Sequence, residues 1–186
     1  MSMKNHPLEM YVADRLSEIL NEKCRPTKAS GASTEIMDVY NSMFFVECKM
    51  TKKTDDFIIK TNELDKAYIQ AHKVLKTEKK VLFVMQNKSN DRIAIIHYTD
   101  LMDLMGEVNF DKYLAIHYTH CNLMKKQFTF YKEDWNEWYL ELQSQGKEKI
   151  PAIVFHDRGL QLYVILDLED FFYLLEKYIL KGEDKE

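Results

Sequence analysis

The chain contains little glycine, proline or cysteine: 5 Gly, 3 Pro and 3 Cys among 186 residues. So few loop-forming residues leave little room for flexible linkers or low-complexity tracts. The three cysteines, Cys24, Cys48 and Cys121, are odd in number and show no C-x-x-C pairing. This pattern favours reduced thiols in a reducing compartment over a disulfide framework.

Long apolar runs are also missing. No run approaches the roughly 18 residues that a membrane-spanning helix needs, and the first residues, MSMKNHPLEM, lack the apolar core of a signal peptide. We therefore expect no membrane partner and a cytoplasmic location.

The overall charge is modest, with a formal net charge of −4 at pH 7. This value argues against a protein that coats nucleic acid, but the charge is unevenly distributed. Residues 1–100 carry 16 Lys and Arg against 14 Asp and Glu, whereas residues 101–186 carry 10 against 16. If part of the chain meets a phosphate backbone, the first half is better suited to do so.

The apolar periodicity alternates between strand and helix, which predicts an α/β protein with a mixed sheet. In the first half the expected strands are 36–39, 43–49, 80–86 and 92–98, and the expected helices are 7–22, 60–77 and one that begins near residue 99. In the second half the expected strands are 113–118, 151–156 and 160–166, and the expected helices are 132–145 and 167–180.

The second half repeats the order of the first at an offset of 70 residues. Few residues are identical at this offset, so a chance similarity of rhythm is the alternative to an internal duplication. Under the same offset Glu47 aligns with His117, and Lys49 aligns with Thr119. A duplicated second copy would therefore lack the charges of the first.

Charged residues end the strand that contains the sequence FFVECK, residues 44–49. Alternate residues of a strand point to the same side, so Phe45, Glu47 and Lys49 share one face. A strand that is apolar on both faces is expected to be central and covered on both sides. Its charged end would then emerge at the sheet edge beside Asp38, which the preceding short strand delivers.

An aspartate beside Glu-x-Lys is a suitable unit for phosphodiester hydrolysis. Mg²⁺ binds one or two carboxylates and retains several waters, and it can activate water that attacks phosphorus. A neighbouring lysine can orient the nucleophile and offset charge in the transition state. An exposed strand end with an ion pair explains the same residues, and on these residues alone that explanation is the more common one.

Glu9 lies within an apolar helical stripe that also contains Val12, Leu16 and Leu20. A carboxylate on a buried face needs a partner, which a metal site or a lysine would supply. A favourable interaction with the helix dipole in the first turn is the alternative. We favour the first explanation because the Asp38 cluster would take a third carboxylate.

In this order, Glu9 on a first helix, the loop SGAST, Asp38 and then VECK followed by a helix resemble the PD-(D/E)xK nucleases. Within that superfamily residues 7–105 are most similar to the phage and archaeal Holliday junction resolvases. Met37 precedes Asp38 where the superfamily's name has proline. The resemblance implies a restriction-endonuclease-like mixed sheet flanked by helices for residues 1–106.

The resemblance also implies roles for individual residues. Catalysis would fall to Glu9, Asp38, Glu47 and Lys49. Asp38, Glu47 and the backbone carbonyl of Cys48 would bind Mg²⁺, for which Mn²⁺ could substitute. Ser30 and Ser33 would lie in the loop that approaches the DNA backbone, and Lys28 of the same loop is a further candidate contact. Apart from the resemblance, Lys52, Lys53 and Lys60 follow the charged strand and are candidates for phosphate contact, with a solvated loop as the alternative.

The implied activity is metal-dependent hydrolysis of branched DNA by a homodimer, because symmetric resolution of a junction needs two sites. If the chain is phage-encoded, it would act in the host cytoplasm. Residues 107–186 would form a second α/β unit, either a degenerate copy or a module for dimerisation or partner binding. The alternatives are a restriction or repair nuclease acting on duplex DNA, and a non-catalytic DNA-binding or assembly protein.

Overall fold

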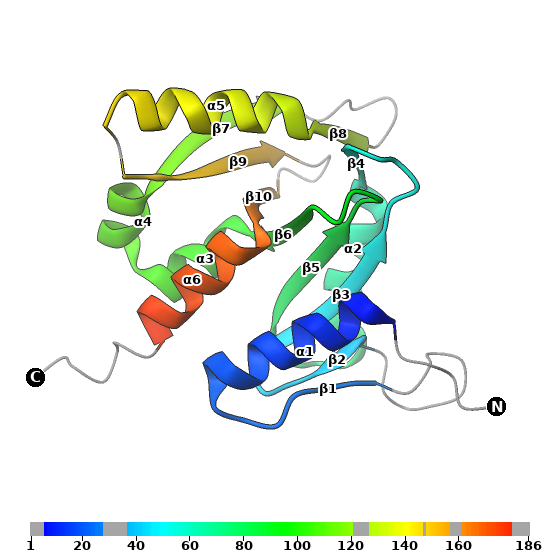
Figure 1. Ribbon diagram of the computed structural model, residues 1–186. Helices are drawn as coiled ribbons and strands as arrows, with labels where there is room; N and C mark the ends of the chain where they lie inside the picture. Colours follow the sequence, from blue (N-terminus) through cyan, green and yellow to red (C-terminus); the bar gives the residue numbers. More distant parts are fainter. Residues whose placement is uncertain (1–5, 28–36, 121–126, 147, 157–160, 180–186) are drawn as a thin grey trace, which may run out of the picture.

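The computed structural model describes residues 6–27, 37–120, 127–146, 148–156 and 161–179. Within these ranges the chain is an α/β protein built on one large mixed sheet with helices on both faces (Figure 1). The α/β class and the mixed sheet that the apolar periodicity predicted are therefore confirmed. The restriction-endonuclease-like arrangement remains a prediction.

The main sheet contains eight strands from the described residues. Their bounds are β1 Arg25–Pro26, β2 Val39–Tyr40, β3 Phe44–Met50, β5 Lys80–Gln86, β6 Arg92–His97, β7 Leu114–His120, β9 Ile150–His156 and β10 Leu162–Asp167. Across the sheet they run in the order β1-β2-β3-β5-β6-β10-β9-β7. A separate two-stranded sheet pairs β4, Asp56–Lys60, with β8, Gln127–Tyr131.

Two layers of helices cover the sheet (Figure 1). The helices are α1 Pro7–Leu20, α2 Thr61–Ile69 with a π-helical continuation Gln70–Val74, α3 Tyr98–Met105, α4 Glu107–Tyr113, α5 Lys132–Ser144 and α6 Leu168–Ile179. One hydrophobic cluster joins α1, α3, α4 and α6 to one face of the sheet, and a second joins α2, α5, β4 and β8 to the other. None of the helices in the described ranges has both the length and the apolar character of a membrane span.

Strand β3 is buried on both faces, as its sequence predicts. Phe44 and Val46 enter the first cluster and Phe45 enters the second, and all three are fully buried. Burial of each such side chain stabilises the fold by about 1.5–3 kcal/mol. The charged residues that follow are therefore attached to a rigid strand.

Strand β4 lies between the expected strand 43–49 and the expected helix 60–77, where the apolar pattern predicted no strand. Phe57 and Ile59 alternate inward and are buried, while Lys60 is exposed. Phe57 packs against Phe130 of β8, with ring centroids 5.7 Å apart. This strand is hard to recognise because its pairing partner lies about 70 residues further along the chain.

The strand arrangement occurs twice in the chain. In each half a first strand is parallel to a second, and the second is antiparallel to a third. The three strands of the second half, β7, β9 and β10, each begin 70 residues after β3, β5 and β6. The offset seen in the sequence is thus a repeat of topology.

The strands that pair between the two halves do so in a nearly symmetric register. In the antiparallel pair β6–β10, Ile95 lies opposite Ile165, its own counterpart at the offset of 70. In the pair β4–β8, Ile58 lies opposite Thr129, at an offset of 71. The main sheet contains strands from both sides of residue 106, hydrogen-bonded into one sheet through the pair β6–β10. Both hydrophobic clusters also contain residues from each half.

Candidate active site

Strand β3 holds Glu47 and Lys49 on the face that carries Phe45. The Lys49 ammonium lies 2.6 Å from the Glu47 carboxylate, and the two side chains are 43% and 22% exposed. Partial burial alone would lower the pKa of Lys49, but its hydrogen bond to Glu47 and the nearby carboxylates raise it. The lysine is therefore cationic over the whole physiological pH range.

Asp38 immediately precedes β2 and lies beside the end of β3. Its backbone N–H donates to the Val46 carbonyl at 2.8 Å. Its carboxylate Oδ2 accepts a 2.7 Å hydrogen bond from the backbone N–H of Cys48. The structure thus brings Asp38 next to the Glu47–Lys49 segment, and the hydrogen bond fixes the orientation of the carboxylate.

The Cys48 carbonyl is directed toward the same edge of β3 as the Asp38 carboxylate. Backbone groups of alternate residues in a strand point to the same edge, and those of Val46 point toward β2. Since β2 contains only two residues, the Cys48 carbonyl lies beyond the pairing of these strands. The Cys48 carbonyl oxygen can therefore serve as a metal ligand.

Glu9 has a structural role as well as a place near the site. In the first turn of α1, its carboxylate accepts from the His6 backbone N–H at 3.4 Å and completes a capping box. Burial and the negative charge of Asp38 raise the pKa of Glu9. The partner of this carboxylate among the described residues is thus the backbone at the start of its own helix, and a role for Glu9 in a metal site stays a prediction.

The pKa of the Cys48 thiol is raised by burial and by three nearby carboxylates. Burial raises the pKa of Cys48 well above its usual value, and the negative charges of Asp38, Glu9 and Glu47 raise it further. The Cys48 thiol thus lies within electrostatic range of the three predicted catalytic carboxylates and of Lys49. However, Cys48 faces the side of β3 that α1 covers, whereas Glu47 and Lys49 share the opposite face with Phe45, so Glu9 is not on the same face as the ion pair. The thiol is neutral and is no nucleophile at neutral pH.

Glu63, in the first turn of α2, is an acidic residue near this site that sequence reasoning missed. Burial raises the pKa of Glu47, the hydrogen bond from Lys49 lowers it, and the charges of Asp38 and Glu63 raise it again. Glu63 also forms an ion pair with Lys60 at 3.4 Å. Its position depends on how β4 returns the chain to the sheet, so no local spacing in the sequence indicates it.

The basic residues predicted to contact DNA are arranged in two places. Lys52 and Lys53 are exposed in the turn after β3, where Lys88 joins them through a 3.0 Å bond from its N–H to the Lys53 carbonyl. Lys60 is exposed at the far end of β4. The remaining three predicted contacts, Lys28, Ser30 and Ser33, lie outside the described residues.

The ligand chemistry suits a hard divalent cation. Asp38, Glu47 and a backbone carbonyl provide oxygen atoms of the kind that Mg²⁺ binds alongside water. Burial is the main cause of the raised pKa of Glu47 and the negative charge of Asp38 adds to it, so a bound cation would favour the ionised form of Glu47. In the described residues no three His, Cys, Asp or Glu side chains are grouped so that they could hold a metal ion together.

The equivalent position in the second half is a cavity of about 680 Å³ between β7, β8 and α5. His117 and Thr119, the counterparts of Glu47 and Lys49, line it together with Trp138. The His117 ring packs 5.6 Å from the Trp138 ring. Here a histidine and a threonine stand where the first half has the ion pair.

Comparison of the chain with family models, with curated proteins and with solved structures gave no match in any of the three. The geometry of the Asp38, Glu47 and Lys49 site and the resemblance of its motifs are therefore the basis for the functional conclusion.

Proposed function

We propose that the chain is a metal-dependent DNA endonuclease that hydrolyses phosphodiester bonds, with branched DNA such as a four-way junction as its substrate. The observation that supports this most directly is the Asp38 carboxylate, held by the Cys48 N–H beside the Glu47–Lys49 pair. An ordinary surface ion pair needs no second carboxylate fixed beside it. The pairing of these groups fits a phosphoryl-transfer site better.

Each side chain has a distinct role in this proposal. Asp38, Glu47 and the Cys48 carbonyl would hold Mg²⁺, which supplies Lewis-acid activation of water and phosphate. Lys49 would orient the attacking water and offset negative charge as it develops on the phosphate oxygens. Glu9 would hold the start of α1 against the site through its cap and add negative potential around it.

The DNA backbone would approach across the exposed lysines that follow β3. Lys52, Lys53 and Lys88 provide positive charge next to the site, and such contacts position a phosphate backbone without reading sequence. This arrangement agrees with the charge asymmetry of the chain, because the acidic second half would repel DNA. In keeping with the nucleases that it resembles, the products would carry 5′-phosphate and 3′-hydroxyl ends. We place the activity in the cytoplasm, that of the host if the chain is phage-encoded.

Cleavage of a labelled four-way junction and of a matched linear duplex, with Mg²⁺ and with chelator, tests this function. We expect metal-dependent cutting of the junction that Lys49→Ala and Glu47→Ala abolish. Thr119→Ala, at the counterpart of Lys49, is the matched control and should cut normally. Equal cutting of the duplex would instead indicate a restriction or repair nuclease. Junction binding without any cutting would indicate a binding or assembly protein.

A further inference from the structure

The contact between the two halves has the form of a dimer interface. In a two-fold dimer, equivalent strands pair antiparallel, and the residue on the axis lies opposite its own copy. In the main sheet Ile95 and Ile165 have this relationship. In the two-stranded sheet Ile58 lies opposite Thr129, which is one residue away from its counterpart at the offset of 70. Two separate strand pairs are therefore centred on one approximate axis within a single chain.

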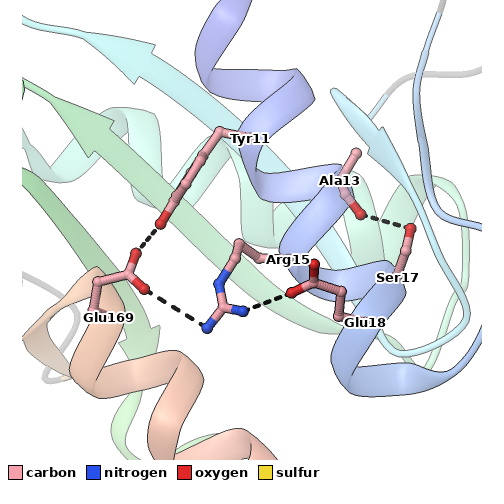
Figure 2. A network of polar contacts seen from close by, with 6 residues as sticks. All are labelled: Tyr11, Ala13, Arg15, Ser17, Glu18 and Glu169. Atoms are coloured by element: carbon pink, nitrogen blue, oxygen red, sulfur yellow. Dashed lines mark hydrogen bonds and ion pairs between the residues drawn. The ribbon is translucent and has the colours of Figure 1, made fainter.

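The second half also contacts the helix that carries Glu9. Figure 2 shows Tyr11 and Arg15 of α1, the helix that carries Glu9, reaching Glu169 at the start of α6. The Tyr11 hydroxyl donates to the Glu169 carboxylate, and an Arg15 guanidinium nitrogen lies 3.7 Å from it. A residue of the second half therefore contributes contacts to α1, in addition to the buried apolar face that packs this helix on the sheet.

The active chemistry is present on only one side of the axis. The first half carries Glu47 and Lys49 on its strand, whereas the equivalent strand carries His117 and Thr119. His117 and Thr119 provide neither a carboxylate nor an ammonium group at these two positions. A homodimer would join two intact sites, but this chain joins one intact site to one altered copy.

From these observations we propose that a single chain is the complete functional unit, in which the second half occupies the place of a partner subunit, and that it makes one incision per bound substrate. The incision rests on the proposed nuclease function, but the one-chain unit does not. In that incision one P–O3′ bond breaks, the oxygen of water joins phosphorus, and a proton from that water passes to the 3′ oxygen. The product is a nicked strand, and a junction is left unresolved after the first cut.

The first readout is the mass of the full chain in solution, measured by light scattering after gel filtration over a range of concentrations, with and without Mg²⁺. We expect the mass of one chain, 22.2 kDa, at every concentration. Twice that mass would overturn the proposal whether or not the protein cuts DNA. The mass of one chain in a protein that cuts nothing would support the one-chain unit and refute the nuclease function.

The second readout is the product formed from a supercoiled plasmid that extrudes a cruciform. The first nick releases the supercoiling and removes the junction, so a linear product requires two cuts by the same bound complex. We expect nicked circles and no linear DNA above the level given by Glu47→Ala. Linear DNA as the main product would overturn the single incision. A plasmid without the inverted repeat separates junction cutting from duplex cutting.

Discussion

The Asp38 carboxylate accepts a hydrogen bond from the Cys48 N–H, which is the backbone group between Glu47 and Lys49. One 2.7 Å contact thus links the residue that precedes β2 to the middle of the charged segment of β3. Because an ordered backbone donor holds the carboxylate, its orientation does not depend on a flexible side-chain partner.

Substitution of Asp38 should separate folding from catalysis. Asp38→Ala leaves the Cys48 N–H without its acceptor, and we expect a loss of about 1–3 kcal/mol in the free energy of unfolding. Asp38→Asn keeps an amide oxygen as acceptor, so its stability should stay close to that of the unsubstituted chain. Both variants should lose metal-dependent cutting because the metal-binding charge is gone. Urea denaturation and the junction assay measure the two effects, and equal stability of the two variants would contradict the role of the hydrogen bond.

Lys49→Met should reduce the rate of cutting by about 10²-fold or more, since a transition-state charge partner is removed. Binding of the junction should change little, because Lys52, Lys53 and Lys88 remain. Single-turnover rates and a binding titration in Ca²⁺ distinguish the two quantities. Loss of binding in parallel with loss of rate would mean that Lys49 positions DNA instead of acting on the phosphate.

Stabilisation by Mg²⁺ should increase with pH. In the folded protein the pKa of Glu47 is raised above 4.5. In the absence of metal, ionised Glu47 therefore lowers the free energy of unfolding. This destabilisation is lost as the pH falls through the raised pKa. A protonated Glu47 cannot bind the cation, and ligand binding stabilises only the state that binds. The rise in Tm on adding Mg²⁺ should therefore be larger at pH 8 than at pH 5. Glu47→Gln should abolish the rise, whereas Glu18→Gln, on the exposed side of α1, should preserve it.

Glu63→Gln should move the acidic limb of the pH–rate profile to lower pH. Glu63 adds negative potential that raises the pKa of Glu47, so its neutralisation favours ionised Glu47 at a given pH. The measurement is the rate of junction cutting in saturating Mg²⁺ between pH 5 and pH 8. If the acidic limb of Glu63→Gln coincides with that of the unsubstituted chain, Glu47 ionisation does not control the rate.

Much of this architecture could be predicted from the sequence because local patterns encode it. The buried alternation in β3 predicted that Glu47 and Lys49 would share the face of Phe45, and the structure agrees. Strand β4 and the approach of Glu63 could not be predicted, because both depend on pairing with β8 across the chain. The helical stripe placed Glu9 facing inward, but its capping bond to His6 depends on the local turn geometry.

Asp170 offers a test of the altered second half that does not depend on catalysis. Its counterpart Asp100 forms an ion pair with Lys80 at 3.6 Å, but Ile150 stands at the position equivalent to that lysine. Burial, together with the negative charge of Asp167, raises the pKa of Asp170 from 3.8 to about 6. The charged form therefore disfavours folding above about pH 6, and this cost is lost as the pH falls toward 3.8.

Asp170→Asn removes that cost, so the free energy of unfolding at pH 8 should rise by about 1 kcal/mol once solvent screening is allowed for. The gain should shrink as the pH falls below 6, because the unsubstituted Asp170 is then protonated and neutral. Asp100→Asn, the matched variant, should instead lose stability at pH 8 because it breaks the pair with Lys80. Urea denaturation at pH 8 and pH 5 measures both, and a loss of stability in Asp170→Asn at pH 8 would mean that this carboxylate has a partner that its ionised form needs.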